Sequence, residues 1–205
     1  MAKIIHHHLG LGDHIVCYGL VRHIAANQAV YLFTKEHNIP TVSAMYAGCN
    51  VHIISVQDDQ HAAQWETHPD YVRYGFKNEN EDVFGAEFYK QAGVPYEYRW
   101  KYLPERDMVR EQALYDSFGQ QDVFIHDDAQ RGYVINKEGF RANIYYTPNI
   151  LDYGMLIENA KEVHCIESSF RLFIDFLNPK GVLYLHFNNE KSFRIVPTKH
   201  IWKIY

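Results

Sequence analysis

The sequence predicts an α/β protein made of two small halves, each with a parallel sheet and crossover helices, which face each other across a cleft. Segments with the apolar pattern of strands alternate with helical segments over residues 1–56, and the same alternation starts again near residue 122. With 205 residues, 47% of them hydrophobic, the chain is long enough to bury a core. We expect an N-terminal half at residues 1–110 and a C-terminal half at residues 111–205.

The first half follows the order strand, helix, strand, helix, strand. Val16, Leu20 and Ile24 recur every four residues, which indicates one face of a helix. Residues 29–34 form a nearly continuous apolar run, typical of a strand that is buried on both faces. The expected elements are strands at 3–7, 29–34 and 51–56, a helix at 13–26 and a short helix at 41–47.

The middle of the chain is rich in aromatic and charged residues, and we expect helices near residues 86–92 and 106–118 within it. Aromatic residues alternate with other residues after Pro95. This alternation fits a strand with one aromatic face or a platform on which a carbohydrate stacks, and packing in the core is the favoured interpretation. The aromatic residues concerned are Tyr96, Tyr98, Trp100 and Tyr102.

The second half repeats the α/β pattern. Its last predicted helix carries apolar residues at positions i, i+3, i+4 and i+7, which form a stripe that one face of the helix can bury. These residues are Phe170, Phe173, Ile174 and Leu177. The expected elements are strands at 122–126, 141–147, 162–166 and 182–187 and helices at 153–160 and 168–177.

Composition excludes several classes of protein. A net charge of −5 argues against a nucleic-acid partner, which would require a basic face. No apolar stretch approaches the roughly 18 residues that span a bilayer. Three histidines interrupt the N-terminus where a signal peptide needs its apolar core, so we expect a cytoplasmic protein, in the host cytoplasm if the source is viral. Cys17, Cys49 and Cys165 lack C-x-x-C spacing and are expected to be reduced and mostly buried.

The most informative motif is a glycine-rich turn between the first strand and the first helix. Gly10 and Gly12 can take positive φ and bring a ligand close to the backbone. Unpaired N–H groups at a helix start favour an anion. Asp13 and His14 stand at the mouth of this turn and can move a proton; alternatively, Asp13 is simply the N-cap of the helix.

A second strand-to-helix turn occurs at the equivalent place in the second half. Ser168 or Ser169 can cap the following helix, and their hydroxyls with the first N–H groups suit a diphosphate. Glu167 can accept hydrogen bonds from a ribose or sugar hydroxyl. His164 belongs to the same turn. An ordinary N-cap with a glutamate beside it is an equally common interpretation of this turn alone, but two such turns in two halves favour a functional one.

A third cluster leaves the strand at 122–126 and enters a loop. Ligands in open α/β sheets bind outside the carboxyl ends of strands, where His126 and Asp128 lie. Arg131 can clamp a phosphate with two hydrogen bonds. A bound metal is not expected, because the adjacent carboxylates of Asp127 and Asp128 point to opposite faces of a strand.

Other polar runs have simpler interpretations. Of the three histidines at residues 6–8, at most His6 and His8 share a strand face, so structural or supporting roles are expected rather than a metal site. The Asp58–Asp59 pair and the acidic run at residues 79–82 are expected to be solvated surface charges.

At these motifs the chain resembles small glycosyltransferases of the GT-B type, which have two Rossmann-like domains. The stretch HLGLGDHIVCYGLVRHIA at residues 8–25 is similar to the opening of viral and bacterial glycosyltransferases. It is more distantly similar to heptosyltransferases and to nodulation and core fucosyltransferases. The run LIENAKEVHCIESSFRLFIDFL at residues 156–177 resembles their donor-domain segment, and the closing KHIWKIY resembles the end of the short members.

The resemblance implies transfer of a sugar from a nucleoside diphosphate donor to an acceptor hydroxyl, with no obligatory metal and no cofactor besides the nucleotide sugar. It implies an acceptor and catalytic N-terminal half and a donor-binding C-terminal half. Asp13 matches the base of heptosyltransferases, with His14 as the reserve. Arg131 stands where fucosyltransferases place an arginine on the diphosphate. The residues expected to bind the donor are Gly10, Gly12, His126, Asp128, Arg131, His164, Glu167, Ser168 and Ser169.

Two other classes of protein compete with this interpretation. One is a non-catalytic protein that binds a sugar or nucleotide on the same fold. The other is a different α/β enzyme, such as a phosphatase-like or epimerase-like protein. A missing third glycine and the absence of Tyr-x-x-x-Lys argue against a nicotinamide-dependent epimerase, and the absence of Gly-x-Ser-x-Gly argues against an α/β-hydrolase.

Overall fold

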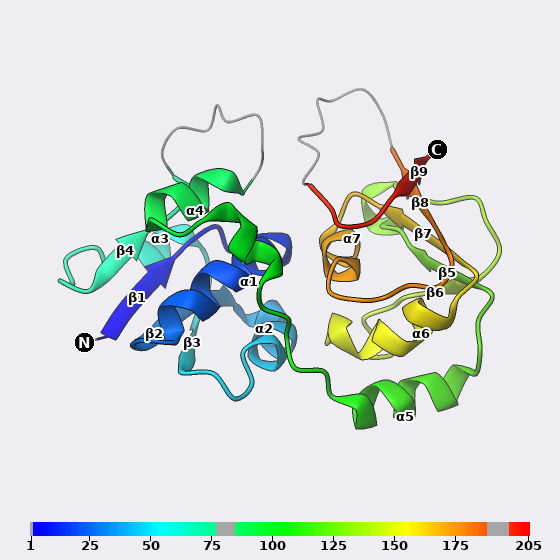
Figure 1. The fold of residues 1–205 in the computed structure, drawn as a ribbon, viewed down its shortest axis with the longest axis horizontal. Helices are drawn as coiled ribbons and strands as arrows, with labels where there is room; N and C mark the ends of the chain where they lie inside the picture. The colour runs from blue at the N-terminus through cyan, green and yellow to red at the C-terminus, as the bar shows by residue number, and fades with distance from the viewer. Residues whose placement is uncertain (1, 77–84, 188–196) are drawn as a thin grey trace. The chain divides into compact units, whose positions relative to one another are not determined.

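The computed structural model describes residues 2–76, 85–187 and 197–205 (Figure 1). The chain forms two compact units, one of residues up to 105 together with residue 197, and one of residues from 106 onward including 198–205. The division falls slightly before the boundary that the sequence suggested. The acidic run at 79–82 lies outside the described residues. That the two halves face each other across a cleft stays a prediction.

The first unit contains a sheet whose described strands are all parallel. Its order is β3-β2-β1-β4, so β1 is an inner strand with a partner on each side. Ile4 pairs with Tyr31 of β2 on one side and with Tyr71 of β4 on the other. The strands are β1 (Ala2–His6), β2 (Ala29–Lys35), β3 (Val51–Val56) and β4 (Tyr71–Arg73).

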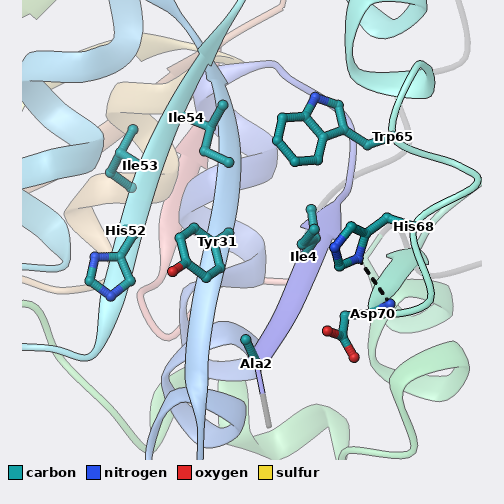
Figure 2. Close-up of a pocket in the computed structure, with 9 residues that line it drawn as sticks. All are labelled: Ala2, Ile4, Tyr31, His52, Ile53, Ile54, Trp65, His68 and Asp70. Atoms are coloured by element: carbon teal, nitrogen blue, oxygen red, sulfur yellow. Dashed lines mark hydrogen bonds between the residues drawn. The ribbon is translucent and has the colours of Figure 1, made fainter.

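The helices of the first unit connect these strands and cover the sheet. The α-helices are α1 (Leu11–Ala25), α2 (Ile39–Met45), α3 (Asp59–Ala63) and α4 (Ala86–Ala92), and the 3-10 helices are η1 (Glu36–Asn38) and η2 (Tyr96–Trp100). One sheet face buries Ile5, Val30 and Leu32. On the other face, Ala62 of α3 belongs to a core cluster with Ile4. Ile4 and its partner Tyr31 on β2 are both labelled in Figure 2.

The aromatic alternation after Pro95 is not a strand. Tyr96 and Trp100 lie on the 3-10 helix η2, and their rings meet edge to face with centroids 5.7 Å apart. This helix packs directly on α1 at Gly19, where an added Cβ would lie 2.0 Å from the carbonyl oxygen of Tyr98. The close approach of the α1 and η2 backbones therefore determines the local structure. The alternation of aromatic residues in the sequence does not reveal this contact.

Among the strands and α-helices described in this unit, β4 and α3 were not expected. The strand β4 has three residues and the helix α3 has five, too few for a periodic pattern. Asp58 caps α3 by accepting a hydrogen bond from the backbone N–H of His61 at 2.9 Å. Asp58 is exposed, as expected of a surface charge, and its carboxylate also serves as this cap.

The second unit contains a second sheet of parallel strands in the order β6-β5-β7-β8-β9. The strands are β5 (Val123–His126), β6 (Phe140–Arg141), β7 (Glu162–Ile166), β8 (Val182–His186) and β9 (Trp202–Ile204). The helices are α5 (Met108–Phe118), α6 (Gly154–Asn159) and α7 (Ser169–Ile174), with 3-10 helices η3 (Ala129–Arg131) and η4 (Ile150–Tyr153).

The strand expected at residues 141–147 is wrong beyond its first residue. After β6 the chain turns, and the hydroxyl of Tyr153 holds the turn by accepting from the N–H of Asn143 at 3.0 Å and donating to its carbonyl at 2.6 Å. Ile144 and Tyr145, which imitate a strand in sequence, are exposed. The C-terminal strand β9 was not expected either, because it has only three residues.

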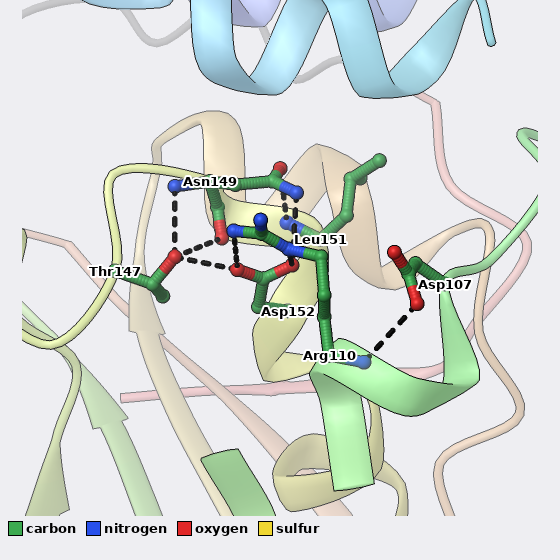
Figure 3. Close-up of polar contacts among 6 residues, drawn as sticks. All are labelled: Asp107, Arg110, Thr147, Asn149, Leu151 and Asp152. Atoms are coloured by element: carbon green, nitrogen blue, oxygen red, sulfur yellow. Dashed lines mark hydrogen bonds and ion pairs between the residues drawn. The ribbon is translucent and has the colours of Figure 1, made fainter. Parts of the chain in front are cut away.

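Ion pairs attach α5 to the second unit and explain where the units divide. Arg110 binds both carboxylate oxygens of Asp152, at 3.1 and 2.8 Å, and Thr147 and Asn149 donate to the same carboxylate (Figure 3). Arg106 binds the buried carboxylate of Glu111 on α5 and also Glu158 of α6, at 2.8 Å. Bidentate pairs of this kind fix geometry as well as charge. The chain therefore belongs to the second unit from residue 106 onward.

Candidate active site

Each unit gathers the carboxyl ends of its strands at one edge of its sheet, because the strands run parallel. Ligands of open α/β sheets bind outside this edge. In the first unit the turn from β1 to α1 lies there, and in the second unit the turns after β5 and β7 lie there. These turns carry the side chains that the sequence singled out.

The glycine turn has a different geometry from the expected one. Gly10 is the N-cap residue of α1 with φ −70°, and Gly12 lies within the helix, so neither has positive φ. Asp13 is the third helical residue and not the N-cap. Its carboxylate folds back over Gly10, where an added Cβ would lie 2.5 Å from Asp13 Oδ2. A glycine at position 10 therefore leaves room for this orientation of the carboxylate and does not serve a left-handed turn.

The Asp13 carboxyl has an unusual acidity. Its half-buried position raises its pKa to about 6, although the charge of His8 and the backbone N–H groups of Asp13 and Gly10 act in the opposite direction. An acidic residue at this position that reaches back to the N-cap N–H is half of a capping box, which holds the side chain in one orientation. A carboxyl with this pKa is suited to accept a proton near neutral pH.

His8 lies beside this carboxyl. Its Nε2 is 2.9 Å from the carbonyl oxygen of Gly75, to which it donates, and its ring stacks on Phe76 with centroids 4.4 Å apart. Because Nε2 carries the proton, Nδ1 is the acceptor in the neutral ring. The expectation for His8 was a structural or supporting role, and its position beside Asp13 becomes visible only in the fold.

His14 lies behind the turn rather than in it. Its side chain is fully buried, its ring meets that of His7 edge to face at 4.6 Å, and burial lowers its pKa well below the ordinary value. Neither of its ring nitrogens has a hydrogen-bond partner among the described residues. His14 therefore does not stand at the mouth of the turn as expected, because its ring is enclosed in the core, whereas Asp13 is only half-buried there.

A partly buried chain of hydrogen bonds, centred on the buried His6, supports the same edge of the sheet. His6 donates from Nε2 to Asp59 Oδ1 at 3.0 Å and accepts at Nδ1 from the Tyr71 hydroxyl at 2.6 Å. The Asp59 side chain is 49% exposed, as expected of a surface charge, and it also pairs with His6. Sequence could not pair these residues, because the partners lie on three separate elements. A supporting role for His6 agrees with this arrangement.

In the second unit Asp128 and Arg131 lie together after β5. Asp128 caps η3 by accepting from the N–H of Arg131 at 3.2 Å, and its other oxygen lies 3.2 Å from Arg131 Nε. The Arg131 side chain is 78% exposed. An exposed ion pair of this kind contributes about 0–1 kcal/mol, so the guanidinium can leave it for a stronger anion.

Two polar atoms at this edge have no partner among the residues that the structure describes: His126 Nδ1 and Ser168 Oγ, both of them buried. His126 is the last residue of β5, and Ser168 follows the end of the neighbouring strand β7. The two strands are paired, with His126 opposite Cys165. Burial lowers the pKa of His126 to about 4, so its ring is neutral at pH 7. Buried polar atoms without partners are rare and call for an explanation such as an absent ligand or water.

Two of the other donor-binding candidates, His164 and Glu167, have protein partners. His164 lies within β7, where Nδ1 is 2.8 Å from His186 Nε2 and Nε2 is 3.0 Å from Glu162 Oε2. Glu167 accepts from Nε of the buried Arg171 at 2.7 Å. Ser168 is the N-cap residue of α7 by its backbone, but its hydroxyl makes no capping bond. Ser169 begins that helix.

Carboxylates next to this edge are engaged as well. Asp127 accepts from the N–H of Ile135 at 3.0 Å and pairs with Arg141. Within the described ranges, no group of three or more His, Cys, Asp or Glu side chains is gathered as a metal site requires. No helix in these ranges is long and apolar enough to cross a membrane.

Comparison with known proteins shows the fold. No protein-family model and no curated protein matches the chain. Among solved structures, the chain is similar to the crystal structure of the glycosyl transferase family 9 from Veillonella parvula DSM 2008, with a TM-score of 0.64 at 10% sequence identity. The match covers 100% of this chain and 85% of that one. The expected fold class, two parallel-sheet halves of the GT-B-like kind, is thereby confirmed.

Proposed function

We propose that this protein transfers a glycosyl group from a nucleoside diphosphate sugar to a hydroxyl of a glycan acceptor. The observation that carries the proposal is the Asp13 carboxyl, half-buried at the carboxyl edge of a parallel sheet with a pKa raised to about 6. The similarity of the fold to that of a glycosyl transferase family 9 protein supports the same reaction class.

The chemistry requires a base of this kind. A sugar hydroxyl is a poor nucleophile until its proton is removed. In the proposed reaction the Asp13 carboxylate takes this proton while the hydroxyl oxygen attacks the anomeric carbon. The bond from that carbon to the diphosphate oxygen breaks, and the diphosphate leaves with the electron pair. With a pKa of about 6, the carboxyl is ionised in most molecules at pH 7 and is more basic than an exposed aspartate.

The donor is assigned to the second unit. Arg131 would bind the diphosphate with two N–H groups and neutralise its charge, with Asp128 orienting the arginine. His126 Nδ1 and Ser168 Oγ supply unused polar atoms to the same ligand, together with Ser169. The proposal assigns charge neutralisation to these groups rather than to a metal and requires no cofactor besides the nucleotide sugar. Glu167 and His164 would then shape the site through their protein partners.

The test measures release of nucleoside diphosphate from GDP-, UDP- and ADP-sugars, with water or added sugars as acceptor. Asp13→Asn keeps the hydrogen bonds of the turn and loses the base, so we expect release to fall by about 10²–10⁴-fold. The thermal shift produced by the nucleotide sugar should persist. Asp122→Asn is the matched control, because Asp122 is exposed and pairs only with Lys161 among the described residues.

Three outcomes would contradict the proposal in different ways. Equal release by Asp13→Asn and the unchanged protein would remove Asp13 from the role of base. Stabilisation by a nucleotide sugar with no release from the unchanged protein would indicate the non-catalytic binding protein. If no nucleotide sugar raises the unfolding temperature of the protein, the proposal that its donor is a nucleoside diphosphate sugar is contradicted.

A further inference from the structure

A pocket of about 470 Å³ lies in the first unit, on a face of the sheet rather than at its carboxyl edge. We call it the sheet pocket. Ile4 of β1, Tyr31 of β2 and His52 of β3 are in register and point to the same face, where they form its floor (Figure 2). The residues that line it are Ala2, Ile4, Tyr31, His52, Ile53, Ile54, Trp65, His68 and Asp70.

The wall opposite Tyr31 is held in place by hydrogen bonds of the protein itself. It comes from the segment between α3 and β4, which supplies Trp65, His68 and Asp70 (Figure 2). The carbonyl of Asp70 accepts from the N–H of Ile4 at 2.9 Å, and the N–H of His68 donates to the carbonyl of Trp65 at 2.8 Å. A pocket that is formed before its ligand arrives loses little entropy on binding.

The lining combines aromatic faces with hydrogen-bonding groups. Tyr31 and Trp65 remain 38% and 39% exposed, and the Tyr31 ring is stacked on that of His52 at 5.0 Å. The Asp70 N–H donates to Nδ1 of His68 at 3.2 Å, so the neutral His68 ring carries its proton on Nε2 and can donate it. Among the described residues, nothing donates to the Asp70 carboxylate.

The charges select the class of ligand. The described residues that line the sheet pocket include no lysine or arginine, so it is unsuited to a phosphate or a nucleotide. A neutral saccharide has an apolar C–H face that packs on an aromatic ring and a rim of hydroxyls that donate to a carboxylate. We propose that the sheet pocket is a binding site for a neutral saccharide, with Trp65 and Tyr31 contacting the sugar face and Asp70 accepting from its hydroxyls.

This site is separate from the proposed reaction, because none of its residues belongs to the glycine turn. It gives the protein a second contact with a glycan, away from the atoms that react. A glycan held at two places dissociates more slowly than one held at a single place. The inference does not depend on the proposed transfer activity, and its test uses no nucleotide.

The experiment presents the full chain to an array of neutral glycans and then measures the affinity of the bound glycans by titration. Asp70→Asn removes the charged acceptor, and Trp65→Ala removes a ring face. We expect binding by the unchanged protein and affinity weakened about tenfold or more in each variant. Tyr145→Ala is the control, because Tyr145 is an exposed aromatic residue of the second unit.

Trp65→Ala removes a packing contact with Phe33. If the Trp65→Ala protein does not fold, Asp70→Asn is the decisive variant. Binding that survives Asp70→Asn and Trp65→Ala unchanged would overturn the proposal, as would an array on which no neutral glycan binds. Tetramethylammonium is the remaining probe, since a carboxylate beside aromatic rings also suits a cation. Its binding at this pocket in place of any glycan would overturn the saccharide assignment.

Discussion

The two strand-to-helix turns resemble each other in sequence but treat their carboxylates differently. In the first turn, burial raises the pKa of Asp13 to about 6, because the other interactions of this carboxylate do not offset its desolvation. Glu167 in the second turn is paired with the buried Arg171, four residues further along the chain. The residue four places after Asp13 is Cys17, a buried thiol whose pKa is raised well above its ordinary value and which is therefore neutral.

The comparison shows that the residue one helical turn onward separates a reactive carboxylate from a structural one. An arginine at that place neutralises the charge, whereas a thiol leaves the carboxyl basic. Strained or poorly compensated charges are frequent at sites that carry function, because stability has been given up there. The following predictions test the comparison through the stability of the chain.

The largest effect is expected from Arg171→Met. This variant removes the guanidinium from Glu167 and leaves a largely buried carboxylate that has lost its charge partner, which costs about 3–5 kcal/mol in the free energy of unfolding. Urea denaturation followed by circular dichroism measures it. Arg131→Met is the matched control, since its pair with Asp128 is exposed, and it should cost less than about 1 kcal/mol. Equal losses in the two variants would show that Glu167 is not held by its arginine.

A smaller effect of opposite sign is expected from Asp13→Asn. The folded-state pKa of about 6 lies above the unfolded value, so the folded protein binds more protons between about pH 4 and pH 6, and the stability contributed by this group is lost as pH rises. Removing the carboxylate should therefore stabilise the chain by about 1–2 kcal/mol above pH 6, allowing for its partial exposure. The gain should shrink towards zero near pH 4.

Thermal unfolding of both proteins across this pH range measures that difference. Glu167→Gln is the companion variant and should destabilise the chain at pH 7, because it removes the partner of Arg171. A stability difference for Asp13→Asn that does not change with pH would contradict the raised pKa.

The smallest effect on stability is expected from Gly10→Ala. An alanine Cβ would lie 2.5 Å from Asp13 Oδ2, so the carboxylate must turn away and lose the Gly10 N–H. The loss resembles that of a helix cap, about 1 kcal/mol, because φ −70° suits alanine. Nucleotide-sugar turnover should fall by more than this small loss of stability explains, because the proposed base loses its orientation. In an Asp13→Asn background the same change should reduce turnover no more, and an additional reduction would place the role of Gly10 elsewhere.

Long apolar runs made much of the fold predictable. The strands at 51–56 and 162–166 were predicted at the bounds that the structure shows, because each is an unbroken apolar or alternating run. The stretch after Phe140 has the sequence pattern of a strand, because Ile144 and Tyr145 are residues typical of strands, but both are exposed in a turn. Tertiary contacts determine whether such a segment forms a strand, and these contacts cannot be inferred from local composition.

The candidate site was predictable only in part. Asp13 follows from its place after a strand and before a helix. The contribution of Asp59 does not, because it bonds to His6 across a separation that no local pattern encodes. The opposite error concerns His14, which stands beside Asp13 in sequence but points into the core. Neighbours on a helix face different directions, so adjacency in sequence is weak evidence of a shared site.

The inner position of β1 has a consequence for the order in which the protein folds. Ile4 pairs with Tyr31 on one side and with Tyr71 on the other, and every such pairing in this sheet is parallel. Parallel strands cannot close through a tight hairpin, so each must wait for a crossover segment to be synthesised. At about 5–20 residues per second, the ribosome leaves one edge of β1 open for several seconds after the other has paired. During that interval the nascent chain presents an unpaired strand edge, which is the surface that chaperones protect.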